Sequence, residues 1–134
     1  MNEIVLTRYD YSKLYTMIMN LLESNDSSIS ALNLLNVKIK QAKIAEYQKI
    51  ESDYCTMNTI VDVLFPDTGK VRSFCLVYPQ DVSLRDINLS VLSPLGCALL
   101  GTRKGQTVSV HAPEGYLKVI IQDLRHQSDL DSNE

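Results

Sequence analysis

The chain of 134 residues contains no Trp and only two Phe, and no stretch approaches the length of an apolar membrane span. A transmembrane helix needs about 20 predominantly apolar residues. A secretory signal peptide needs a basic start followed by an apolar run. Neither pattern occurs in the sequence. We therefore expect a cytoplasmic protein with no membrane partner.

Basic residues are scarce as well. Thirteen Lys and Arg stand against sixteen Asp and Glu, which gives a net charge of -3. Proteins that bind nucleic acid regardless of sequence concentrate Lys and Arg on one face. The composition argues against tight binding to bare DNA or RNA, and we expect no direct sequence-specific contact with nucleic acid.

The cysteines are few and do not pair in the sequence. Cys55, Cys75 and Cys97 are odd in number, and none belongs to a C-x-x-C motif. We expect three buried, reduced thiols. A structural zinc site needs four ligands at short spacings, and His111 and His126 do not lie at such a spacing from a cysteine. The sequence predicts no metal and no cofactor.

Motifs of known enzyme classes are also missing. The sequence contains no G-x-x-x-x-G-K-[ST], no G-x-S-x-G and no H-E-x-x-H. Residues 101–105 contain two glycines around a basic pair, but they follow an expected helix, so their amides would not form an anion site at a helix N-terminus. We expect a protein that is not an enzyme.

The first third of the chain has helical periodicity. Apolar side chains recur every three or four residues, with Asp10 placed to cap the first helix and a polar run at 23–28 to end it. So short a connection predicts an antiparallel helical hairpin, a short coiled coil whose apolar seams face each other. Residues 1–8 form either an edge strand or packing beneath the helices, and residues 44–52 either continue the second helix or form a connecting helix. The apolar positions are Tyr11, Leu14, Ile18 and Leu21, then Leu32, Leu35, Ile39 and Ala42.

From residue 53 onward the period changes to two, which is typical of strands. One hairpin is expected across the turn 66–69, and a second joins 107–112 to 116–124 across 113–115. A further strand at 89–92 precedes a short helix. An antiparallel sheet around one helix is an α+β fold. We expect a helical hairpin at 1–52, a second domain at 53–127, and a frayed acidic tail at 128–134.

The stretch from Leu89 to Gly101 encodes that helix with both of its ends. Ser93 is a preferred N-cap, Pro94 suits the first helical position, and Gly101 suits a left-handed stop. The residues between these ends are apolar on nearly all sides, which a helix tolerates only when protein covers it. We expect this helix to lie across a curved sheet as its plug.

The same stretch carries a family resemblance. It reads Ser-Val-Leu-Ser-Pro-Leu-Gly-x-Ala-Leu-Leu-Gly, and Gly105 and a turn at 113–115 follow at suitable spacing. This pattern resembles the C-terminal domain of the bacterial Gre transcript-cleavage factors, and Thr-Met-Asn at 56–58 and Leu-Val-Tyr-Pro at 76–79 resemble their short relative Rnk, the regulator of nucleoside diphosphate kinase. The resemblance covers residues 54–125. It implies an FKBP-like antiparallel sheet wrapped on one short helix, and RNA polymerase as the partner.

The resemblance also points to two groups of residues. In Gre factors the Ser-Pro loop contacts the rim of the polymerase secondary channel, which implies a docking role for Leu92, Ser93, Pro94 and Leu95. Gre factors also carry acidic residues at a coiled-coil tip that help to hold a catalytic magnesium ion. Glu23 and Asp26 occupy the tip here, although both also suit ordinary turn or solvated positions. Gre helices are about twice as long, and the loss of about ten residues would withdraw this tip by about 15 Å from the position that a Gre tip reaches.

We therefore expect a regulator of transcription elongation that docks on RNA polymerase and competes for the secondary channel without stimulating transcript cleavage. The alternative is an FKBP-like peptidyl-prolyl isomerase or another protein-binding module. Those isomerases bind proline in a pocket of aromatic side chains that includes Trp, which this chain lacks. Nothing in the sequence resembles a nucleotide site, so an influence on nucleoside diphosphates would be indirect.

Overall fold

The computed structural model describes four stretches of the chain, residues 4–24, 32–45, 54–112 and 115–126. The predicted tip residue Asp26, most of the predicted connection at 44–52 and the predicted tail at 128–134 lie outside them. Within the described stretches, no helix combines the length and the apolar character needed to span a membrane.

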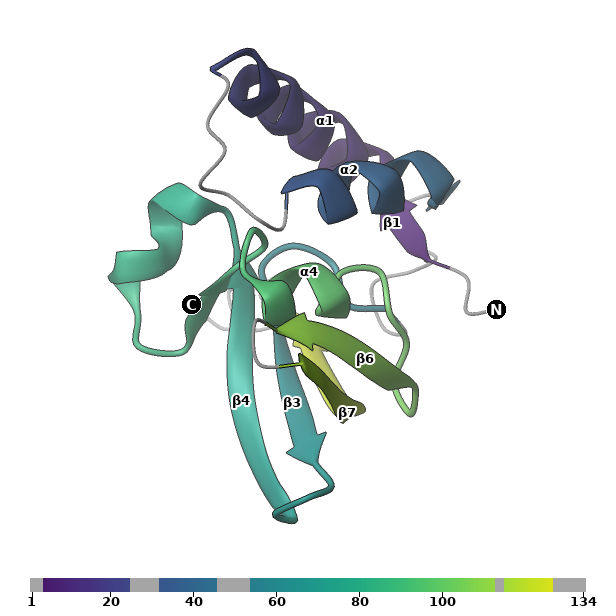
Figure 1. The fold of residues 1–134 in the computed structure, drawn as a ribbon, viewed down its shortest axis with the longest axis vertical. Coiled ribbons are helices and arrows are strands. Elements are labelled where there is room, and N and C mark those ends of the chain that lie inside the picture. Colours follow the sequence, from purple (N-terminus) through teal and green to yellow (C-terminus); the bar gives the residue numbers. More distant parts are fainter. Residues whose placement is uncertain (1–3, 25–31, 46–53, 113–114, 127–134) are drawn as a thin grey trace.

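Two helices and two short strands form what we call the helical layer. Its elements are β1 (Val5–Thr7), α1 (Arg8–Glu23), α2 (Leu32–Gln41) and β2 (Lys43–Ala45). The two helices lie side by side above the rest of the chain (Figure 1). The expected apolar positions Leu14, Ile18, Leu32, Leu35 and Ile39 are buried. The antiparallel coiled-coil geometry of the pair stays a prediction, because its connection at 25–31 is not described.

The N-terminus of α1 differs from the prediction. Thr7, not Asp10, is the N-cap, since its backbone is extended and its hydroxyl accepts a hydrogen bond from the Asp10 N–H at 3.0 Å. Asp10 lies in the first turn with its carboxylate buried. Both residue types favour helix starts, and the buried strand before α1 decides between them because it brings Thr7 to the cap position.

The strands β1 and β2 decide between the two alternatives for residues 1–8 and correct the prediction for the residues after α2. Residues 5–7 form a strand, and it pairs in parallel with residues 43–45. The expectation that Ile44 continues a helix is therefore wrong. The physical reason is a competing partner: the Lys43 N–H donates to the carbonyl of Ile4 at 2.8 Å, which draws the backbone into a strand directly after α2.

The five-stranded sheet has the order β5-β4-β3-β7-β6. Both predicted hairpins are confirmed, since β3 pairs with β4 and β6 with β7, each antiparallel. The strands are β3 (Thr59–Phe65), β4 (Lys70–Val77), β5 (Asn88–Ser90), β6 (Thr107–Ala112) and β7 (Gly115–His126).

One edge of the sheet departs from the predicted antiparallel pattern. The strand β5 pairs in parallel with β4 and ends at Ser90, before the expected end at Leu92. A parallel pair cannot be joined by a tight turn. The chain makes the crossover through the 3-10 helix η1 (Pro79–Leu84), a segment that we expected to be a simple polar connection.

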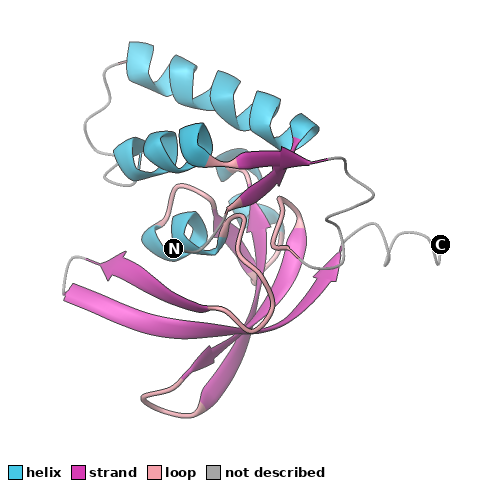
Figure 2. Cartoon of the chain, turned by 90° about the vertical axis from the view of Figure 1, so that its right-hand side faces the viewer, coloured by secondary structure: helices cyan, strands magenta, loops and turns pink. Residues whose placement is uncertain are grey.

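The predicted plug helix is α4 (Pro94–Leu99), and it lies between the sheet and α2 (Figures 1 and 2). Side chains of both helices of the layer, of α4 and of the inner face of the sheet join in one apolar cluster. The three cysteines are free and buried, as expected. The mixed α and β class is confirmed, while the FKBP-like comparison and the domain boundaries stay predictions.

Candidate functional site

The start of α4 carries the four residues predicted to dock on a partner. Ser93 has an extended backbone, and its hydroxyl accepts a hydrogen bond from the Gly96 N–H at 3.0 Å. The same hydroxyl donates to the carbonyl of Ser90 at 2.6 Å. Pro94 occupies the first helical position, where no N–H is required. The predicted cap is confirmed, and it ties the helix start to the end of β5.

Gly96 fixes α4 on the sheet by close contact. A Cβ at this position would collide with the carbonyl oxygen of Ser90 and would lie 2.9 Å from the Ser93 hydroxyl. The helix therefore rests directly on the backbone of β5, with no room for a side chain between them. Glycine weakens a helix interior, so a glycine between two clear helix ends indicates a place where another backbone comes close to the helix.

The docking residues combine partial exposure with firm anchoring. Leu92, Ser93, Pro94 and Leu95 are all half-buried. The two leucines pack against the apolar cluster, so the surface they share with Pro94 cannot move freely. The fold brings these four residues together in a single turn at the helix start, and their docking role stays a prediction.

The C-terminal end of α4 involves residues that the sequence analysis partly missed. Gly101 has a φ of 79°, which confirms the predicted left-handed stop. The ammonium group of Lys38, on α2, donates to the carbonyl of Cys97 at 2.5 Å and to that of Ala98 at 2.9 Å. Lys38 lies between the buried positions Leu35 and Ile39, so its place on the inner face of α2 could have been read from the periodicity.

Burial determines the protonation of the groups around Lys38. Burial lowers the pKa of Lys38 to about 8. Burial raises the pKa of the Cys55 thiol to about 12 and also raises the pKa of the Cys97 thiol. Near neutral pH the site therefore contains an ammonium group beside two neutral thiols, and main-chain carbonyls supply its acceptors.

The helix tip is the second predicted site. Glu23 is the last residue of α1 and its side chain is exposed. Asp26 lies outside the described residues, and the role of the two carboxylates stays a prediction.

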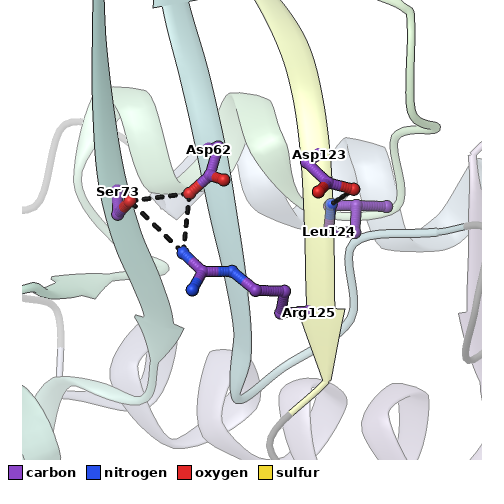
Figure 3. Close-up of polar contacts among 5 residues, drawn as sticks. All are labelled: Asp62, Ser73, Asp123, Leu124 and Arg125. Carbon is purple, nitrogen blue, oxygen red and sulfur yellow. Dashed lines mark hydrogen bonds and ion pairs between the residues drawn. The ribbon is translucent and has the colours of Figure 1, made fainter.

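A polar cluster that the sequence did not predict lies on the face of the sheet away from α4. The Asp62 carboxylate accepts hydrogen bonds from the Ser73 hydroxyl at 2.6 Å and from the Arg125 guanidinium at 2.8 Å (Figure 3). Asp123 lies opposite Asp62 in the strand register and pairs with Lys104 at 3.3 Å. The Leu124 N–H, helped by Lys104, lowers the pKa of Asp123. Each carboxylate thus has a basic partner, and the cluster ties three strands together.

Two further observations bear on chemistry. Among the described residues, no group of three or more His, Cys, Asp and Glu side chains is placed to hold a metal ion. A cavity of about 240 Å³ opens on the outer face of β4. Its lining contains no aromatic side chain and consists of Asn58, Cys75, Val77, Asp81, Leu84, Arg85 and Asn88.

Comparison with known proteins connects this fold to a family. Residues 50–125, more than half of the chain, match the family described as "Transcription elongation factor, GreA/GreB, C-term". The chain is 28% identical over 87 residues to the transcription elongation factor GreA of Dehalococcoides mccartyi, which covers 65% of this chain and 56% of that protein. It is 35% identical over 81 residues to the regulator of nucleoside diphosphate kinase of Escherichia coli, which covers 60% of each.

The matched stretch is thus less than two thirds of the length of these relatives. A solved structure, the prokaryotic transcription elongation factor GreA/GreB from Nitrosomonas europaea, superposes with a TM-score of 0.74 at 24% identity. That superposition covers 94% of this chain and 100% of the other, and it shows a shared fold. With the family match over α4 and the five-stranded sheet, these findings confirm the resemblance: the chain belongs to the GreA/GreB family of transcription elongation factors.

Proposed function

We propose that this protein is a non-enzymatic regulator of transcription that docks on RNA polymerase at the rim of its secondary channel. The contact surface is the turn formed by Leu92, Ser93, Pro94 and Leu95, which we call the docking turn. The observation that carries the proposal is the fixation of this turn: the Ser93 hydroxyl bonds to both β5 and α4, and Gly96 brings the helix onto the backbone of Ser90.

A fixed turn suits binding for a physical reason. Association costs free energy when loops and side chains must be ordered at the interface. This turn is already ordered by its cap and by the packing of its two leucines. Pro94 adds a rigid apolar group with few conformations to lose. Binding energy at protein interfaces concentrates in a few such well-packed residues.

The helical layer is proposed to occupy the channel entrance without stimulating cleavage. The 16 residues of α1 span about 24 Å. The helices of Gre factors are about twice as long, so a tip carrying Glu23 and Asp26 would stop well short of the polymerase active centre. In this proposal residues 1–52 form the hairpin and residues 53–127 form the FKBP-like docking domain.

The test measures binding of the purified protein to core RNA polymerase, with a Gre factor as competitor and a cleavage assay on stalled complexes in parallel. Pro94→Ala is expected to weaken binding at least about fivefold with the fold intact, because it removes the apolar ring. Pro79→Ala is the matched control, since Pro79 also begins a short helix after an extended residue and is half-buried.

The outcomes separate the parts of the proposal. Equal binding by wild type and Pro94→Ala would reject the docking surface. Cleavage that is lost on Asp26→Ala would reject the non-catalytic role and make the tip functional. Absence of binding would reject a polymerase partner and leave an FKBP-like isomerase or another binding module, although the cavity described above offers no aromatic residue to hold proline.

A further inference from the structure

The contact between the helical layer and the rest of the chain combines apolar packing with a few polar side chains. Asp10 on α1 accepts a hydrogen bond from the Met57 N–H at 3.0 Å. The ammonium group of Lys13 lies 4.4 Å from the ring centre of Tyr78. Lys38 on α2 reaches the carbonyl groups at the end of α4. Of these contacts, only that of Lys38 joins the layer directly to the helix that carries the docking turn.

The end of α4 provides acceptors that match Lys38. The last carbonyls of a helix have no acceptor role within the helix, and in a six-residue helix they are a large share of the total. The partial negative charge at a helix C-terminus favours a cation there. Lys38 donates to the carbonyls of Cys97 and Ala98, so one side chain satisfies two of these groups.

The environment of Lys38 suggests a role other than stability. The ionisable groups that face its ammonium are the thiols of Cys55 and Cys97, both neutral near pH 7. Its hydrogen bonds thus come at the cost of removing a charge from water, and among the described residues no carboxylate pairs with it. An apolar side chain of similar length would avoid that cost. Apolar packing is non-directional, whereas charge-assisted hydrogen bonds have defined geometry.

We propose that Lys38 is the positioning residue that fixes the helical layer on α4, so that a partner bound at the docking turn meets α1 and α2 in one defined orientation. The proposal rests on the proposed function for its consequence in the complex. Its premise, a fixed orientation of the layer in the free protein, does not depend on any partner.

The free protein is tested first, by residual dipolar couplings of the backbone amides. In wild type one alignment is expected to fit both the helices and the sheet. In Lys38→Met the helical couplings are expected to fall to about half or less of the values that fit β3 and β7, because the layer now samples several orientations. Lys38→Arg keeps charged donors and is expected to restore one alignment. Lys40→Met, an exposed position on the same helix, is the matched control.

Chemical stability separates positioning from a structural role. The midpoint of urea unfolding of Lys38→Met is expected to stay close to that of wild type, since the lost hydrogen bonds and the relieved burial of charge oppose each other. Loss of folding in Lys38→Met would overturn the proposal and make Lys38 a stability residue. Couplings in Lys38→Met that still fit one alignment would overturn it as well.

The complex is tested with a photo-crosslinking side chain at the exposed position Glu23. Wild type and Lys40→Met are expected to give one set of crosslinked polymerase peptides. Lys38→Met is expected to bind within about twofold of wild type but to spread its crosslinks over several regions. An unchanged crosslink pattern would overturn the proposal. If wild type does not bind polymerase at all, the proposed function fails, whereas the couplings of the free protein still decide the role of Lys38.

Discussion

Replacing Gly96 with Ala tests how closely α4 rests on β5. In an exposed helix this change stabilises by about 1 kcal/mol, because Ala is the better helix former. Here the added methyl group would overlap the carbonyl oxygen of Ser90. That oxygen cannot yield easily, because it accepts hydrogen bonds from the Ser93 N–H at 3.0 Å and from the Ser93 hydroxyl at 2.6 Å. The helix must move instead.

The expected magnitude follows from three contributions. Overpacking a fixed site costs about 1–3 kcal/mol. Moving the Gly96 N–H away from the Ser93 hydroxyl weakens the N-cap, which costs about 1 kcal/mol. The gain in helix propensity offsets about 1 kcal/mol. Gly96→Ala should therefore lower the free energy of unfolding by roughly 1–3 kcal/mol, or the melting temperature by roughly 3–12 °C in a chain of this size.

The assay is urea and thermal unfolding followed by circular dichroism, with Gly69→Ala as the control. Gly69 has a φ of 73° and no atom within 4 Å of its expected Cβ, so only its backbone conformation opposes the change. That costs about 1–2 kcal/mol. Only Gly96→Ala should also weaken binding at the docking turn. If Gly96→Ala is as stable as wild type or more stable, the close contact between α4 and β5 is wrong.

Four further predictions concern three buried ionisable groups. Burial lowers the pKa of Lys38 from 10.5 to about 8, so the unfolded chain binds more protons than the folded chain between these pH values. The free energy of unfolding should therefore rise with pH across that range, by up to about 3 kcal/mol. Urea melts at pH 7.5 and pH 10 should show this rise in wild type and not in Lys38→Met. Asp10→Ala leaves the buried Met57 N–H without its acceptor and should cost about 1–3 kcal/mol, whereas Asp10→Asn keeps an acceptor and should cost less. Burial raises the pKa of Asp10, so its contribution to stability should be largest below pH 3.8 and should be lost as the pH rises through the folded-state pKa; a pH-independent difference from Asp10→Asn would contradict this. Cys55 has a pKa of about 12 and no exposed surface, so a thiol reagent should label it at least about 100-fold more slowly in the native protein than in denaturant, and fast native labelling would refute its burial.

Local signals in the sequence were sufficient for much of the fold. The cap at Ser93 and the left-handed stop at Gly101 depend on neighbouring residues, and both were predicted correctly. The two hairpins follow from strand periodicity and from turns that join adjacent segments. The position of the four consecutive residues Leu92, Ser93, Pro94 and Leu95 at the start of α4 could be predicted for the same reason, while their docking role stays a prediction.

The features that were missed depend on distant partners. Lys38 binds carbonyls 59 and 60 positions further along the chain. Asp10 was predicted to be an N-cap from its residue type alone, since its actual hydrogen-bond partner, the Met57 N–H, lies 47 positions away in the sequence. The parallel edge strand β5 also required a pairing that no local pattern reports. Periodicity indicates which side of a helix is buried, but it does not indicate which backbone carbonyl or N–H groups on the facing element need a hydrogen-bond partner.

The position of β1 has a consequence for folding during synthesis. The Val5 N–H donates to the carbonyl of Gly101 at 3.3 Å, and a Cβ on Gly101 would collide with the side chain of Ile4. The first strand therefore closes against a turn that leaves the ribosome long after it. Until then the buried faces of α1 and α2 have no complete sheet to cover them, and such surfaces favour aggregation or chaperone binding. On a translating ribosome, the emergence of Gly101 from the exit tunnel should be the event that releases this nascent chain from protection.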